Sequence, residues 1–263
     1  MKSKRGLTIL TICLAVICAV AAQKAQAQPK PGISSPAIEY YFLPSTGGSV
    51  TPDSDGIIRR WTLLEPIGKP NRSNTVFVDS YIREAFAYEY FPNQMTVVPK
   101  DGEKVKVMVE KQAPVDLSRG RPQQPTAPAA PVFEKQTLTW HCLDSKMFHV
   151  KLFRFATGLD KERYGIVCWA VTVIYCDEDL KDVRLAVGSN SASMWWVDGN
   201  EAVILSGDRR MVMDDATSKR LTLTKGRHVL RGAVINGPGM SDFCVRIIDE
   251  DGKPVKNYTI ANQ

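Results

Sequence analysis

Much of the chain consists of short runs in which hydrophobic and polar residues alternate, the pattern of half-buried β-strands. The clearest run is EKVKVMVEK at 103–111, where Val105, Val107 and Val109 share one face. This alternation predicts an antiparallel strand with one buried face. Nearer the N-terminus, 57–64 predicts another strand, which Pro66 ends.

From residue 137 onward, strand-like segments follow one another with short turns between most of them. They are predicted at 137–143, 147–156, 164–176, 183–189, 193–197, 201–205, 219–223, 227–235 and 242–249. Gly-containing turn sequences separate several of them, including DG at 198–199 and NGPG at 236–239. Many short strands with little helix predict an all-β sandwich or barrel. The segment 164–176 is apolar on both faces, which predicts a central strand covered on both sides.

One segment departs from the strand pattern. In DSYIREAFAYEYF, Ile82, Ala85 and Phe86 recur at helical spacing and Asp79 is placed to cap them, so we expect one short helix at about 80–88. Residues 112–131 contain five prolines and little apolar bulk, too little to offset the entropy of ordering them. We expect a disordered loop there rather than a linker, because strands continue on both sides.

The N-terminus has the features of an export signal. Basic residues at 2, 4 and 5 precede a short apolar run, and Ala25 and Ala27 stand at the small-residue positions of a cleavage site. The prediction is a signal peptide at 1–27, a Pro/Ser linker at 28–36 and one β-sandwich domain at 37–263. An uncleaved membrane anchor is the alternative. Cleavage gives an exported, periplasmic or extracellular protein, with no membrane span expected in the mature chain.

Removing the first 27 residues changes the charge argument. The whole chain has 34 Lys and Arg against 28 Asp and Glu, and the signal holds four of the basic residues and no acid. The mature chain is left with 30 basic and 28 acidic residues, without a basic block. This near balance gives no electrostatic reason to expect a nucleic-acid partner.

Four cysteines remain in the mature chain: Cys142, Cys168, Cys176 and Cys244. All lie in strand-like segments. Cys168 and Cys176 are eight residues apart on one predicted strand, too far to bond to each other. The pattern favours buried free thiols, and one disulfide stays open as the alternative. Their spacing does not suggest a metal site.

The C-terminal half resembles a known family of modules. Its ordered features are Gly188-Ser189, Trp196–Gly199, Arg209 and Arg210 with Asp214 and Asp215, Leu223–Leu230, Gly237–Gly239 and Asp249–Gly252. This order resembles the galactose-binding-like jelly-roll modules attached to secreted bacterial glycan-degrading enzymes, and DGIIRRWTLLEPI at 55–67 resembles their first strand. The whole chain is also similar to secreted gut-Bacteroidetes proteins loosely labelled acetylxylan esterases. The resemblance covers about 53–67 and 183–256 and implies a galactose-binding-like jelly-roll sandwich.

A hydrolase would need catalytic residues that the sequence does not display. There is no Gly-x-Ser-x-Gly nucleophile elbow and no metal-ligand spacing. The three histidines, His141, His149 and His228, are each read as structural, and we name no catalytic or metal-binding residue. A distant carboxylate pair stays open. Binding is therefore favoured over catalysis, with carbohydrate esterase as the less favoured alternative.

Sugar binding requires aromatic faces beside polar side chains. Trp61, Trp140 and Trp169 are expected in the core, whereas the loops at 188–193, 206–215 and 236–242 are placed to form one polar rim. The candidate ligand-binding residues are Trp196, Asn190, Asp208, Arg209, Arg210 and Asp242. No cofactor is expected, although a structural calcium is possible in this fold class. The expected partner is a glycan, or an envelope protein if the module is structural.

Trp195 and Trp196 stand side by side in this sequence. Side chains alternate along a strand, so the two indoles must point to opposite faces and cannot form one stacking platform. We expect Trp195 in the core and a type I′ turn at Asp198-Gly199. Trp196 is then the tryptophan to test for a ligand, unless a loop covers it.

Overall fold

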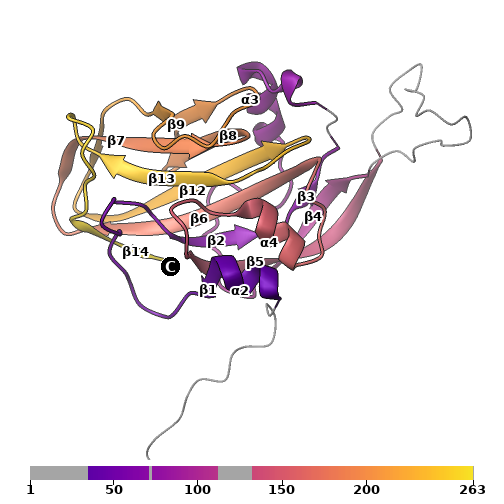
Figure 1. Cartoon of the computed structure of the whole chain (residues 1–263), viewed down its shortest axis with the longest axis horizontal. Helices are drawn as coiled ribbons and strands as arrows, with labels where there is room; N and C mark the ends of the chain where they lie inside the picture. Colours follow the sequence, from indigo (N-terminus) through magenta and orange to yellow (C-terminus); the bar gives the residue numbers. More distant parts are fainter. Residues whose placement is uncertain (1–34, 71–72, 112–131, 263) are drawn as a thin grey trace, which may run out of the picture. The chain divides into compact units, whose positions relative to one another are not determined.

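The alternating segments build two antiparallel sheets, one large and one small (Figure 1). The computed structural model describes residues 35–70, 73–111 and 132–262. The large sheet runs in the order β1 (Phe42–Pro44), β5 (Phe133–Ser145), β2 (Arg60–Leu64), β6 (Ile166–Cys176), β12 (Gly226–Asn236), β8 (Ala192–Val197) and β9 (Asn200–Leu205). Three more strands pair with members of this path: β14 (Tyr258–Ala261) and β3 (Ile67–Gly68) with β6, and β4 (Lys104–Glu110) with β5.

The small sheet is organised around β7 (Leu180–Ser189). It pairs with β13 (Phe243–Ile248), β10 (Ala216–Thr217) and β11 (Leu221–Leu223). The two sheets face each other, because Phe243 of β13 packs edge-on against Trp61 of β2 and Trp195 of β8. The predicted all-β sandwich is confirmed. The assignment to galactose-binding-like modules stays a prediction.

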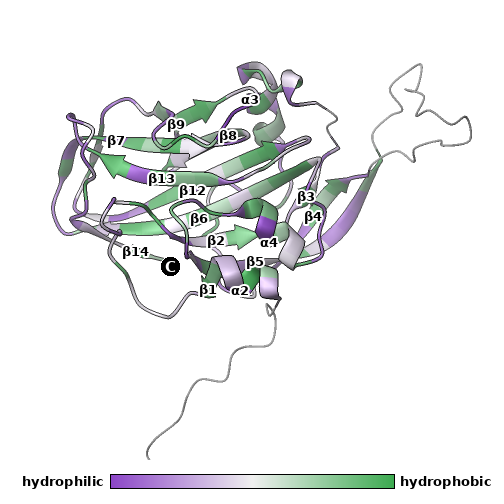
Figure 2. Cartoon of the chain, in the orientation of Figure 1, coloured by the Kyte–Doolittle hydropathy of each residue, from purple (hydrophilic) through white to green (hydrophobic). Residues whose placement is uncertain are grey.

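The central position of β6 is confirmed. Ten of its eleven residues are buried, and it pairs with β12 along its whole length. Figure 2 shows β6 and β12 mainly in hydrophobic colours, whereas the connecting loops carry more hydrophilic residues. The strand at 103–111 is also confirmed as half-buried β4, with Val107 and Val109 buried and Lys104 and Lys106 exposed.

One tight contact explains a glycine in the middle of β12. Gly232 pairs with Trp195 across the sheet, and a Cβ added at Gly232 would lie 2.3–2.6 Å from atoms of that indole. Trp195 therefore fills the space that a side chain at 232 would occupy. A glycine inside a central strand costs β-propensity, and here close packing is the reason for it.

The predicted helix is present as α3 (Asp79–Ala87), with Ile82, Ala85 and Phe86 on its buried side. Its N-cap differs from the expectation. The cap residue is Val78, without a side-chain cap bond, and Asp79 lies in the first turn. A carboxylate there still interacts favourably with the helix dipole. A single turn of 3-10 helix, η1 (Asn74–Val76), precedes α3.

The prediction of a single helix is wrong, because the structure has two further α-helices. The segment 147–156, predicted as a strand, instead holds a bend and the start of α4 (Leu152–Gly158), so His149 does not lie in a strand. Leu152, Phe155 and Ala156 are buried at helical spacing, a period that the apolar composition obscured. The other is α2 (Pro36–Tyr41), capped by Ser35, so its N-cap and first residue fall within the predicted linker 28–36.

The four cysteines are free and buried, as favoured from the sequence. Burial raises the pKa of the Cys168 thiol to about 12 and those of Cys142, Cys176 and Cys244 to about 11. A thiol is nucleophilic as its thiolate, so these groups are inert near neutral pH.

Two predictions concern residues that the structure does not describe. The signal peptide at 1–27 and the Pro-rich loop at 112–131 lie outside the described residues. Within the described ranges, the helices are all too short or too polar to cross a bilayer.

Candidate functional site

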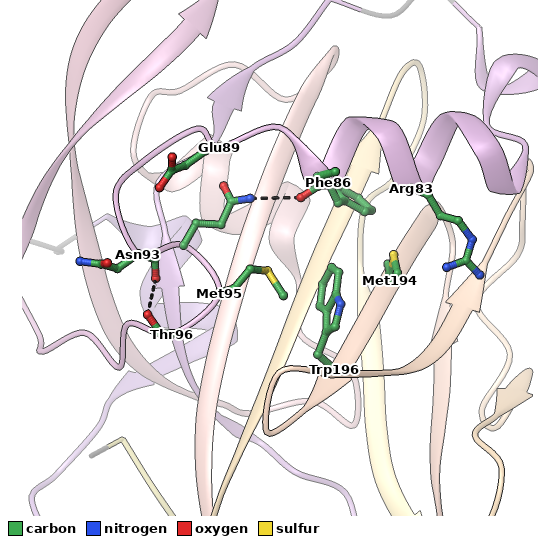
Figure 3. Close-up of a pocket in the computed structure, with 10 residues that line it drawn as sticks. Arg83, Phe86, Glu89, Asn93, Met95, Thr96, Met194 and Trp196 are labelled. Carbon is green, nitrogen blue, oxygen red and sulfur yellow. Dashed lines mark hydrogen bonds between the residues drawn. The ribbon is translucent and has the colours of Figure 1, made fainter.

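A pocket of about 570 Å³ lies on the face of the large sheet that turns away from β13. We call it the Trp196 groove, and Figure 3 shows its walls. One wall comes from α3 and the segment that follows it, and the other from β8. The groove is lined by Arg83, Phe86, Ala87, Glu89, Asn93, Gln94, Met95, Thr96, Met194 and Trp196.

The apolar wall is built on a fixed aromatic stack. Trp196 lies nearly parallel to Trp169 of β6, with an interplanar angle of 14° and ring centroids 5.8 Å apart. Phe86 of α3 meets both indoles edge-on, at 6.1 and 6.3 Å. The side chain of Trp196 projects from β8 and lies between those of Met95 and Met194 (Figure 3). Its exposed fraction is 6%, so the groove uses only its margin.

Gln94 fixes the shape of the polar wall. Its amide accepts a hydrogen bond from the backbone N–H of Tyr90 at 3.0 Å and donates to the carbonyls of Phe86 and Tyr88 at 3.1 and 2.9 Å. Asn93, at the turn, has a φ of 58°, a left-handed conformation that asparagine tolerates. These bonds hold the chain that leaves α3 in a loop over β8, with Glu89, Asn93 and Thr96 at the groove.

One end of the groove carries an ion pair. Both terminal nitrogens of Arg83 on α3 donate to the carboxylate of Glu201 on β9, with Nη2 to Oε1 at 2.6 Å. Glu201 does not line the groove, whereas Arg83 does. The pair ties α3 to the edge strand β9, and the side chain of Arg83 also lines the groove.

A second arginine is buried behind the groove. Arg231 of β12 pairs with Trp196 across the sheet and is 2% exposed. Its Nη2 donates to the carbonyl of Val97 at 2.6 Å, while its Nη1 is buried without a hydrogen-bond partner. Burial lowers the pKa of Arg231 to about 10. This face of the sheet therefore buries a guanidinium group whose hydrogen-bonding capacity is only partly satisfied, which costs free energy.

The sequence-predicted residues do not gather around Trp196. Asp242 is fully buried, and its carboxylate binds Lys151 Nζ at 3.0 Å and the N–H of Phe153 at 3.3 Å. It thus supplies a cap to α4 from a distant part of the chain. Asn190 accepts a hydrogen bond from the backbone N–H of Asp242 at 2.7 Å, so these two residues lie together.

The remaining candidates occupy a different loop. Asp208 accepts a hydrogen bond from Asn74 at 2.9 Å. Arg209 is ion-paired with Asp215 and donates to the carbonyl of Ser206, whereas Arg210 is exposed. None of these residues lines the Trp196 groove. Their role in binding stays a prediction.

Asn74 joins two of the three polar loops. Its Nδ2 donates to Asp208 at 2.9 Å and to the carbonyl of Pro238 at 2.8 Å, and its Oδ1 accepts from Gly237 N–H at 3.1 Å. The loops at 206–215 and 236–242 therefore meet through a residue that the sequence reasoning had not singled out. Neither its spacing nor its surroundings in the sequence marked it.

Sequence reasoning missed most of the groove. Trp196 was singled out, but the opposing wall comes from α3 and residues 88–96, 100 or more positions before Trp196 in the chain. The available signal was the break in the strand pattern at 79–91. That break predicted the helix but not the face on which it lies.

Comparisons with known proteins leave the family open. No family model and no curated protein matches the chain. Among solved structures, the chain is similar to the PA14 domain of the antifreeze protein MpAFP, with a TM-score of 0.33 and 11% identity over 79% of this chain and 89% of that one.

The described residues were also compared with the requirements of a metal site. Nowhere in 35–70, 73–111 and 132–262 do three or more His, Cys, Asp or Glu side chains gather as a metal site would require. A structural calcium held partly by backbone or amide oxygens stays a prediction.

Proposed function

We propose that this protein is an exported, non-catalytic β-sandwich that binds carbohydrate in the Trp196 groove. The observation that carries the proposal is the pairing of an apolar wall with polar groups in one open pocket of about 570 Å³. Ligand pockets have volumes of this order and combine apolar walls with a few polar groups.

The chemistry of the two walls suits a sugar. A sugar ring presents apolar C–H groups, which Trp196, Met194 and Met95 can contact, and hydroxyls, which need hydrogen-bonding partners. Thr96 and Asn93 supply neutral partners, while Arg83 and Glu89 supply a charged donor and a charged acceptor. The groove thus offers both kinds of contact without a change of fold.

The same lining favours binding over hydrolysis. Among the described residues that line the groove, Glu89 is the one carboxylate, and there is no His, Ser or Cys. Glycoside hydrolysis generally uses two carboxylates, and ester hydrolysis uses a nucleophile with a base. The proposal therefore assigns the groove to recognition.

The first test is a screen of the mature protein against plant, microbial and host glycans, followed by titration of any binder. Trp196 is the most exposed of the five tryptophans, so occupation of the groove should change the emission of the protein and reduce its quenching by acrylamide. The proposal fails if no glycan binds, or if a glycan binds without changing the emission or the quenching.

A matched pair of variants tests the location. Arg83→Ala removes a groove residue and should weaken binding about tenfold, the effect of losing one charge-assisted hydrogen bond. Glu201→Ala breaks the same ion pair but leaves the groove lining intact, so it should not weaken binding. Equal weakening by both variants would show that only the ion pair matters and would place the ligand elsewhere.

A further inference from the structure

A second pocket lies on the other side of α3 from the Trp196 groove. Its volume is about 180 Å³, and we call it the tyrosine pocket. Tyr81 and Ala85 come from α3, Tyr88 and Tyr90 from the segment after it, and Phe133 from the start of β5. Aromatic rings supply half of its eight lining residues, whereas the Trp196 groove has two among ten.

The rings enclose the pocket from more than one direction. Tyr88 meets Tyr90 edge-on, with centroids 4.9 Å apart and planes at 70°. Tyr88 also stacks on Phe133 with planes at 19° and centroids 6.0 Å apart. Tyr88 and Phe133 are exposed. The faces of such rings carry negative potential, and several faces around one space attract a cation.

Two carboxylates add to this potential. Glu84 on α3 and Glu110 at the end of β4 line the same pocket. Lys69 lies 3.5 Å from Glu110, whereas no basic side chain of the described residues pairs with Glu84. Burial raises the pKa of the Tyr81 phenol, and the charges of Glu110 and Glu84 raise it further. The lining of the pocket therefore holds two carboxylates, Glu84 and Glu110, against the one ammonium group of Lys69.

One polar atom in the wall has no partner. Tyr90 is 4% exposed, and its hydroxyl oxygen is buried without a hydrogen bond. Leaving a buried hydroxyl unsatisfied costs about 1–3 kcal/mol. The oxygen itself has almost no accessible surface, so an N–H or O–H donor of a ligand would reach its lone pairs only if the neighbouring rings move aside.

From the rings, the carboxylates and the unpartnered hydroxyl together, we infer that the tyrosine pocket binds a protonated amine. The charge of an alkylammonium group would lie against Tyr88, Phe133 and Tyr81 with Glu84 as counter-ion, and one of its N–H groups would donate to Tyr90 Oη. The volume suits a primary ammonium group on a short alkyl chain. This site is separate from the carbohydrate proposal and does not depend on it.

The experiment titrates the mature protein with n-butylammonium chloride by NMR, beside n-butanol as the neutral analogue and tetramethylammonium chloride as a cation without N–H. Butylammonium should saturate the pocket, and butanol should bind at least about tenfold more weakly, because it lacks the charge. Tetramethylammonium should bind more weakly than butylammonium, because it cannot donate to Tyr90. Equal affinity for butanol and butylammonium would overturn the proposal.

Variants locate the site. Glu84→Gln should weaken butylammonium binding about tenfold, whereas Glu89→Gln, an exposed carboxylate a few residues away in the Trp196 groove, should leave it unchanged. Tyr88→Ala should abolish binding. Tyr164→Ala removes an equally exposed tyrosine that packs on Phe153 elsewhere, and it should not affect binding.

The hydroxyl of Tyr90 has its own variant. Tyr90→Phe keeps the ring and removes only the unpartnered oxygen, so the fold should be retained. Butylammonium should then bind several-fold more weakly, while tetramethylammonium should bind as before. If Glu84→Gln has no effect, or if Tyr90→Phe weakens both cations alike, the assignment of these contacts is wrong.

Discussion

Trp195 and Trp196 are neighbours in the chain, but they lie in two very different environments. Trp195 points between the two sheets, where Trp61 and Phe243 pack against it edge-on and Gly232 leaves it room. Trp196 points to the opposite face, where α3 and residues 88–97 cover it. The first environment is sheet against sheet, and the second is sheet against a helix and a loop.

The two faces differ in how completely they are filled. Around Trp195, the packing is so close that one added methyl group would overlap the indole. Around Trp196, the covering leaves a groove of about 570 Å³ and encloses Arg231 without a counter-ion among the residues that the structure describes. Two regular sheets can interdigitate along their length, whereas one short helix and a loop cannot cover a broad twisted surface. The incompletely covered face is where we propose that ligands bind.

The largest expected effect comes from truncating each tryptophan in turn. Trp195→Ala should lower the free energy of unfolding by about 3–5 kcal/mol, because it leaves a cavity that close-packed neighbours cannot fill. Trp196→Ala should cost about 2 kcal/mol less, because water from the groove can enter the space. Urea denaturation followed by circular dichroism measures both values. Equal losses would mean that the two faces are equally well packed.

The second-largest expected effect is a difference in stability cost between replacing two buried arginines, Arg60 and Arg231. Arg60 binds both carboxylate oxygens of Asp144 at 2.8 and 2.7 Å, and this hydrogen bonding raises its pKa. Arg231 has no carboxylate partner within the described part of the chain, and burial lowers its pKa. Arg60→Met should cost about 3 kcal/mol of stability, whereas Arg231→Met should change it by less than about 1 kcal/mol or increase it.

The same denaturation experiment measures both arginine variants. If Arg231→Met costs as much as Arg60→Met, the guanidinium of Arg231 has a stabilising partner that its contacts do not display. The covering of the Trp196 face would then be better optimised than the structure indicates.

The smallest effect concerns the turn at Asp198-Gly199, which follows the two tryptophans in the chain. His228 Nδ1 lies 2.6 Å from the Asp198 carboxylate and Nε2 lies 2.7 Å from the Thr224 carbonyl. Both partners accept hydrogen bonds, so the folded state favours the doubly protonated ring. Burial lowers the pKa of His228, but the hydrogen bonds to Asp198 and Thr224 outweigh it and raise the pKa overall.

The sign of the pH effect follows from that shift. This stabilisation is fully present below the unfolded-state pKa of about 6.5 and is lost as the pH rises through the higher folded-state pKa. Asp198 is partly exposed, so the loss should be roughly 0.5 kcal/mol. Thermal unfolding of the wild type and His228→Gln between pH 6 and 8 should show that the variant lacks this decline.

His149 provides the matched control. Burial lowers its pKa, and the nearby charge of Lys151 lowers it further, so its contribution has the opposite sign and is lost as the pH falls. His149→Gln should retain the decline of stability above pH 6 that His228→Gln removes. A decline that persists in His228→Gln would assign the effect to another group.

The strands were predictable wherever alternation or a continuous apolar run decided them. The alternation of Val105, Val107 and Val109 predicted β4. The segment 164–176, which is apolar on both faces, predicted that β6 is a central strand. The errors fell where composition misled. Residues 147–156 are rich in large apolar side chains, which are compatible with either a strand or a buried helix. In the structure, α4 packs against Ile38 and accepts a cap from Asp242, and these long-range contacts favour the helix.

The candidate site was predictable only in part, because its two walls are far apart in the sequence. Trp196 was identified from alternation alone, but Met95 and Gln94 gave no signal. Asp242 was read as a polar loop residue open to a ligand, yet the structure buries it beside Lys151 as a cap for α4. Exposure of a polar side chain depends on which distant element packs over it, and a single sequence carries no record of that.

The sequence by itself therefore determined the strand periodicity, the opposite orientation of Trp195 and Trp196, and the turn at Asp198-Gly199, whose φ angles of 50° and 80° agree with it. These properties are local, because side-chain direction and turn geometry depend on adjacent residues. Only the tertiary structure decided which face α3 covers and that Arg231 is enclosed with no carboxylate of the described residues beside it. It also decided that Tyr81, Tyr88, Tyr90 and Phe133 surround one pocket. Those outcomes depend on long-range packing, which pairs residues that no local rule connects.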